Sequence, residues 1–114
     1  MPQELVEANP PVLRDVPTEF RSDVLDYMAR SLVLRPAHLL ELARVGGVDH
    51  ILLSGYNVGS AYLAPLPGLS TFLRRLEFSA CYELTDQHLL RALRSLTGLE
   101  ELSLDRCKVK IHHP

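Results

Sequence analysis

The chain has 114 residues, of which 46% are hydrophobic and 23% are charged, a composition that fits one small globular domain and excludes a disordered chain. Its formal net charge of −2 at pH 7 gives no positive field to attract nucleic acid or an anionic membrane surface, so neither is an expected partner. Two cysteines are too few for a disulfide-rich secreted scaffold and the first residues carry no signal-peptide pattern, so we expect a cytoplasmic or nuclear protein.

Residues 1–15 predict a flexible N-terminal arm, because they contain several prolines and show no sustained periodicity. A helix is then predicted from Pro17 or Thr18 to about Ser31. Apolar residues recur in this segment at helical spacing, and acidic residues occupy its first turns.

A second helix is predicted from Pro36, which suits the first position of a helix, to the pair Gly46 and Gly47, which would end it. Two such amphipathic helices cannot bury both apolar faces on each other alone, so one face is expected to pack on the segment that follows. Residues 16–47 are therefore a predicted helical cap.

The second half of the chain contains an internal repeat. Four apolar or cysteine positions recur with an offset of 26 residues, and a weaker copy precedes them with an offset of 25. The matched sets are Leu73, Leu76, Phe78 and Cys81; Leu99, Leu102, Leu104 and Cys107; and, in the weaker copy, Val48, Ile51, Leu53 and Tyr56. Strict alternation predicts a short strand at 76–78 and again at 102–104. The leucines between Asp86 and Leu96 are spaced as in a helix that Thr85 caps.

The pattern LxxLxLxxC followed by LTDxxLxxaLxxL resembles the cysteine-containing class of leucine-rich repeat. The resemblance implies an α/β fold: a short leucine-rich-repeat solenoid with parallel strands on a concave face, helices outside and an N-terminal helical cap. Residues 48–114 would then hold one degenerate, one complete and one truncated repeat. We expect an array with an uncovered last repeat either to be part of a longer array or to self-associate through that end.

Strand alternation also predicts a partner surface. If the strand leucines and Phe78 face the core, the alternate residues face outward and form rows across the concave face. The rows are His50, Arg75 and Glu101; Leu52, Glu77 and Ser103; and Ser54, Ser79 and Asp105. A mixed and mostly polar ladder suits a protein partner better than a phosphate backbone, and an ordinary solvated face is the alternative.

The helical cap has a resemblance of its own. The run VPTEFRSDVLDYM followed by LLELARV resembles the F-box, a helical module that docks on the adaptor of a cullin ubiquitin ligase, and is also similar to the Zyg-eleven type of ligase substrate receptor. This resemblance implies adaptor contacts by Val16, Pro17, Leu25, Leu39, Leu42, Ala43 and Val45. A plain cap that only covers the end of the repeats is the alternative.

No catalytic or cofactor motif is present, so we expect neither an enzyme nor a bound cofactor or metal. Cys81 and Cys107 are predicted to pack under the turns that follow their strands, and Cys107 with His112 and His113 lacks the ligand spacing of a zinc site.

The uncharged segment 51–73 is long enough to span a bilayer, but Pro65 and Pro67 favour a buried segment of a globular core. The sequence thus predicts a protein–protein interaction module. It would form part of a substrate-recognition subunit of a cullin-type ubiquitin ligase or, alternatively, be a structural or regulatory scaffold fragment with no ligase role.

Overall fold

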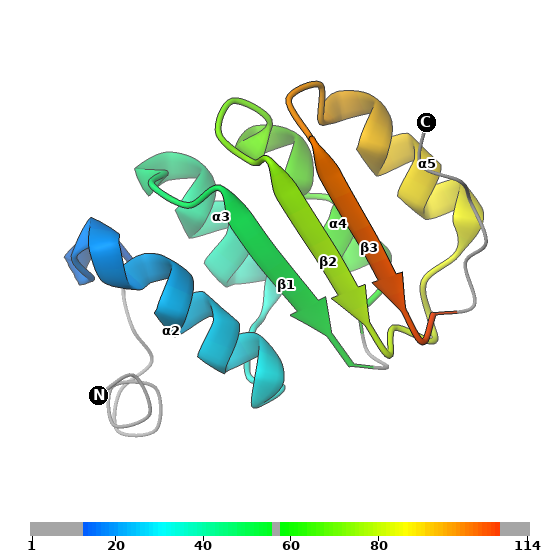
Figure 1. Ribbon diagram of the computed structural model, residues 1–114, viewed down its shortest axis with the longest axis horizontal. Helices are drawn as coiled ribbons and strands as arrows, with labels where there is room; N and C mark the ends of the chain where they lie inside the picture. The colour runs from blue at the N-terminus through cyan, green and yellow to red at the C-terminus, as the bar shows by residue number, and fades with distance from the viewer. Residues whose placement is uncertain (1–12, 56–57, 108–114) are drawn as a thin grey trace.

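A three-stranded parallel sheet, with strand order β1-β2-β3, organises the molecule. The computed structural model describes residues 13–55 and 58–107. In chain order, the elements of this part are the 3-10 turn η1 (Leu13–Asp15), α2 (Thr18–Arg30), α3 (Pro36–Val45), β1 (His50–Ser54), α4 (Ser60–Leu63), the 3-10 turn η2 (Leu66–Leu69), β2 (Arg75–Ser79), α5 (Asp86–Ser95) and β3 (Glu101–Asp105) (Figure 1). The fold is therefore mixed α/β, as predicted.

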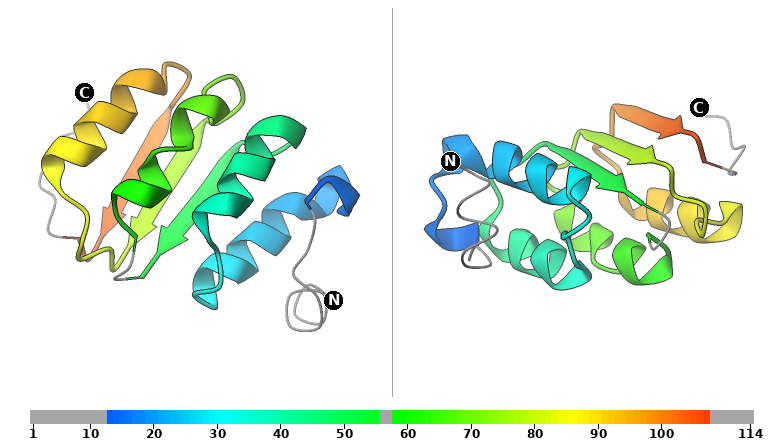
Figure 2. Two further views of the ribbon diagram at one scale, coloured as in Figure 1. Left: turned by 180° about the vertical axis from the view of Figure 1, so that it is seen from behind. Right: turned by 90° about the horizontal axis from the view of Figure 1, so that it is seen from below.

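Three of the helices lie on one side of the sheet. α3, α4 and α5 stand side by side behind the three strands, whereas α2 runs along the outer edge of β1 (Figure 2). One face of the sheet is thus covered by helices, and we call the other face, which the helix layer leaves uncovered, the open sheet face (Figure 1).

Both N-terminal helices begin and end where the sequence predicts. α2 starts directly after Pro17 and ends at Arg30, and α3 starts with Pro36. Gly46 stops α3 because its φ of 64° lies in the left-handed region, and its N–H donates to the Leu42 carbonyl at 2.8 Å.

The predicted flexible arm extends too far. Leu13, within the expected arm, is fully buried and belongs to η1, which packs against α3. Its N–H donates to Oε1 of Glu41 at 3.0 Å, and the Arg21 guanidinium donates to its carbonyl at 3.1 Å. A single leucine carries no periodic signal, so only the tertiary contact orders this turn. Residues 1–12 lie outside the described part of the chain.

The repeat seen in the sequence reappears in the backbone. The N–H groups of residues 74 and 75 both donate to the Asp49 carbonyl, and those of residues 100 and 101 both donate to the Arg74 carbonyl. Each strand is followed by a residue of positive φ: Gly55 at 114°, Ala80 at 53° and Arg106 at 52°. Strand entry and strand exit are therefore built in the same way in successive units.

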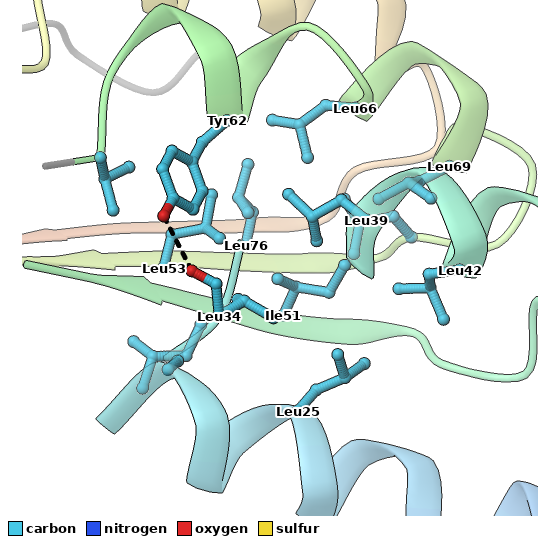
Figure 3. Close-up of a cluster of buried hydrophobic side chains, with 14 of the residues drawn as sticks. Leu25, Leu34, Leu39, Leu42, Ile51, Leu53, Tyr62, Leu66, Leu69 and Leu76 are labelled. Carbon is cyan, nitrogen blue, oxygen red and sulfur yellow. Dashed lines mark hydrogen bonds between the residues drawn. The ribbon is translucent and has the colours of Figure 1, made fainter. Parts of the chain in front are cut away.

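The inward residues of the strands form the centre of the core. Ile51, Leu53, Leu76 and Phe78 are each at most 1% exposed, and side chains from the helix layer pack on them (Figure 3). The Tyr62 hydroxyl is the polar link in this region, because it donates to the Leu34 carbonyl at 2.8 Å and so ties α4 to the loop between α2 and α3.

The first repeat unit has only short helical pieces. Pro65 and Pro67 cannot donate to a helical ladder, so α4 ends after one turn and η2 follows as a second short piece. α5, in the next unit, contains no proline and runs for ten residues, capped by the Thr85 hydroxyl, which accepts from the His88 N–H at 3.3 Å. Tyr56, the predicted counterpart of the two cysteines, lies outside the described residues.

Candidate protein-binding surface

The open sheet face carries the three rows predicted from strand alternation. In the sheet register, Arg75 pairs with His50 and Glu101, Glu77 with Leu52 and Ser103, and Ser79 with Ser54 and Asp105. The rows follow directly from repeat offsets of 25 and 26 residues, because equal strand positions in successive units become neighbours in a parallel sheet.

Leu52 departs from the prediction of an exposed row. It is only 8% exposed, because α2 packs against β1. The other eight residues of the three rows are half-buried or exposed. Contact with a partner would therefore fall on β2, β3 and the polar residues of β1.

One ion pair and one histidine–carboxylate contact cross the sheet near the start of the strands. The Arg75 Nε lies 2.9 Å from the Glu101 Oε2, and the His50 imidazole contacts the Glu77 carboxylate diagonally across β1 and β2. Such pairs between solvent-exposed groups contribute little stability, about 0–1 kcal/mol each. They place basic and acidic side chains next to one another on the open sheet face.

A shallow depression of about 240 Å³ lies at the carboxyl ends of the strands. Three serines line it, Ser54, Ser79 and Ser103, and none of their hydroxyls has a hydrogen-bond partner within the described ranges. Glu77 and Asp105 add carboxylates to the same depression. Hydroxyls that both donate and accept can bind the N–H and C=O groups of a peptide backbone.

Two arginines complete the depression and were missed by the sequence reasoning. Arg30, the last residue of α2, donates to Oδ2 of Asp26 at 2.8 Å, a hydrogen bond that raises the pKa of its guanidinium. Arg106 donates to Oδ2 of Asp105 at 3.3 Å. No strand pattern could have found Arg30, because its place depends on how α2 docks beside β1.

The predicted adaptor contacts belong mostly to the core. Val16, Leu25, Leu39 and Leu42 are at most 6% exposed, because the apolar faces of α2 and α3 are needed to cover the end of the sheet. Of the other predicted contacts, Ala43 and Val45 are half-buried and Pro17 is exposed. Four of the seven are thus not available on the surface of this conformation.

The cysteines lie in equivalent turns. The Cys81 thiol is fully buried and donates to the Leu53 carbonyl at 3.3 Å, while the Cys107 thiol donates to the Asp105 carbonyl at 3.3 Å. Among the described residues, no three or more His, Cys, Asp or Glu side chains are grouped so that they could hold a metal ion. His112 and His113 lie outside the described residues.

Comparison with protein-family models, with curated proteins and with solved structures gave no match. Within the described ranges, none of the helices combines the length and the apolar character that crossing a bilayer would require.

Proposed function

We propose that the chain is a leucine-rich-repeat interaction module that binds a segment of a partner protein on its open sheet face. The observation that supports this most strongly is the depression, which is lined by serines from all three strands, two carboxylates and two guanidiniums. Neighbouring groups of opposite charge with free hydroxyls match a polypeptide, which offers backbone amides and side chains of both signs.

Three features support the repeat assignment. Strand starts are separated by 25 and 26 residues, each strand is followed by a residue of positive φ, and Cys81 and Cys107 occupy the same place after β2 and β3. A stacked repeat needs these features to recur, because each unit buries its apolar side on the next.

The test is a screen of a displayed random-peptide library against the immobilised chain. Peptides selected by the natural chain are measured again on the double variant Ser79→Arg with Ser103→Arg, which fills the depression with two long side chains. We expect their affinity to fall by roughly tenfold or more, which corresponds to about 1.4 kcal/mol.

Gln87→Arg is the matched control, because Gln87 is exposed on α5 in the helix layer, away from the open sheet face. It should leave the selected peptides bound as before. Equal binding to the natural chain and the double variant would contradict the proposal.

The more specific proposal, a substrate-recognition subunit of a cullin-type ubiquitin ligase, stays a prediction that rests on the helical segment. Leu39 and Leu42 cannot test it, because an aspartate at either buried position would unfold the chain. Pro17→Glu and Val45→Asp are better variants. If both leave the recovery of a cullin adaptor unchanged, or if the natural chain recovers none, the scaffold alternative without a ligase role is favoured.

A further inference from the structure

A groove on the helix layer lies on the opposite side of the molecule from the open sheet face. It runs between α4 with η2 on one side and α5 on the other, which stand side by side in Figure 2, and has a volume of about 500 Å³. α4 is a single turn, and it contributes the small side chains of Ser60 and Ala61 to the groove lining.

The groove lining is apolar with a positive edge. Ala61, Leu63, Ala64, Pro67 and Ala92 are its apolar lining residues, and no carboxylate is among the residues that line it. Arg91 is its cationic residue and, within the described ranges, makes no ion pair, unlike the arginines of the open sheet face. The electrostatic complement of this groove is therefore an anion.

His88 provides a second observation. Its imidazole lines the groove, and its Nδ1 atom is buried without a hydrogen-bond partner in the described part of the chain. A buried polar atom without a partner is unfavourable and calls for an explanation. A turn of the half-buried ring about its Cβ–Cγ bond would bring Nδ1 to the groove, where an oxygen atom of a ligand would supply the missing bond.

We propose that this groove binds an acidic, amphipathic peptide segment. Its apolar side chains would lie on Ala61 and Ala64, where the small residues allow close approach, while a carboxylate pairs with Arg91 and reaches His88. The groove is open to solvent along one side, which suits a helix laid in it, because such a helix needs only one covered face. This site is separate from the open sheet face and does not depend on it.

The probe is a synthetic peptide of about 15 residues, long enough to form a helix, with leucines on one face and glutamates on the flanks. A second peptide has lysine in place of every glutamate. Titration calorimetry with the full chain should detect binding of the glutamate peptide and at least about tenfold weaker binding of the lysine peptide.

Arg91→Glu should weaken binding of the glutamate peptide about tenfold. Arg94→Glu is the matched control, because Arg94 is exposed one turn further along α5, makes no ion pair in the described part and does not line the groove. Ala61→Phe, at an exposed position, should block binding by filling the groove, while Ser79→Arg on the open sheet face should change nothing.

Circular dichroism verifies that each variant folds. Absence of binding by the natural chain, equal affinity for the two peptides, or equal losses in Arg91→Glu and Arg94→Glu would each overturn the proposal. Binding that Ser79→Arg abolishes and Ala61→Phe spares would place the peptide on the open sheet face instead.

Discussion

Two cysteines in equivalent turns experience different surroundings. Cys81 is covered by the next repeat unit, whereas Cys107 follows the last described strand and stays half-buried. Burial raises the pKa of the Cys81 thiol to about 12, and the neighbouring Cys107 raises it as well. At pH 8 almost no Cys81 thiolate exists, and the thiolate is the reactive form.

Iodoacetamide at pH 8 should therefore modify Cys107 in the folded chain and leave Cys81 unmodified, as read by peptide mass spectrometry. In urea both cysteines should react at similar rates, which serves as the control. Modification of folded Cys81 at the rate of Cys107 would contradict the burial of this thiol.

His38 makes stability depend on pH. Its Nδ1 accepts the Arg35 N–H at 2.9 Å at the start of α3, and burial lowers the pKa of its imidazole below the ordinary 6.5. The unfolded chain therefore binds a proton first as the pH falls. The contribution of neutral His38 to stability is fully present above about pH 6.5 and is lost as the pH falls toward the folded pKa.

Urea unfolding at pH 7.5 and pH 5.5 tests this dependence. His38→Gln keeps a side chain that can accept from the Arg35 N–H but does not titrate. The natural chain should lose more unfolding free energy between the two pH values than the variant. Equal losses would show that His38 does not contribute.

At the scale of single elements, α5 depends on its cap. The Thr85 hydroxyl accepts a backbone N–H that would otherwise have no partner in the first turn. Thr85→Ala should lower the free energy of unfolding by about 1 kcal/mol in urea titrations, and Thr85→Ser should restore most of it. If the Thr85→Ala chain were as stable as the natural chain, the Thr85 cap would make no contribution to the stability of α5.

Elements with strong periodicity were predictable from the sequence and the others were not. α2, α3 and α5 have clear start and stop residues, and β2 and β3 alternate strictly, so the predicted places of these elements were confirmed. η1 consists of three residues whose order depends on the burial of Leu13 against α3, a contact that no local pattern encodes. α4 and η2 lie in a proline-rich segment where local signals oppose a long helix.

In the candidate site, too, local sequence patterns predict some features, while others depend on tertiary contacts. The three rows of the open sheet face follow from repeat offsets, whereas Arg30 enters the depression only through the docking of α2 beside β1. Burial of Leu52 has the same cause. The position of a strand can be predicted from its local sequence pattern, whereas the docking of a helix against a sheet edge cannot.

At the scale of the whole molecule, the two sheet edges differ. α2 packs along β1 and covers that edge. At the other edge, the inward side chains of β3 and the turn after it are only half-buried: Leu102, Leu104 and Cys107. Their equivalents in and after β2 are fully buried: Leu76, Phe78 and Cys81. The sequence predicted that this end either continues into a longer array or self-associates, and the second alternative can be tested. Antiparallel pairing of two β3 strands centred on Ser103 would place Glu101 opposite Asp105 of the second copy, and like charges in that position are destabilising.

Glu101→Lys should therefore promote dimers. The substitution replaces the two repulsive Glu101–Asp105 pairs between the copies by two attractive lysine–aspartate pairs. We expect roughly tenfold tighter association in sedimentation equilibrium. Glu83→Lys makes the same change of charge at an exposed position outside β3 and should leave the oligomeric state as it is in the natural chain. Identical sedimentation of both variants would exclude pairing through β3.

The half-buried inward face of β3 also determines which part of the native structure unfolds locally at the lowest cost in free energy. β3 pairs with β2, and its inward residues Leu102 and Leu104 are only half-buried, whereas Leu76 and Phe78 of β2 are fully buried. Local unfolding of β3 therefore costs less free energy than that of β1 and β2, which α2 and the buried leucines hold from both sides. Amide hydrogen exchange should then show protection that is highest in β1 and β2 and falls in β3, so the molecule unfolds progressively from one end.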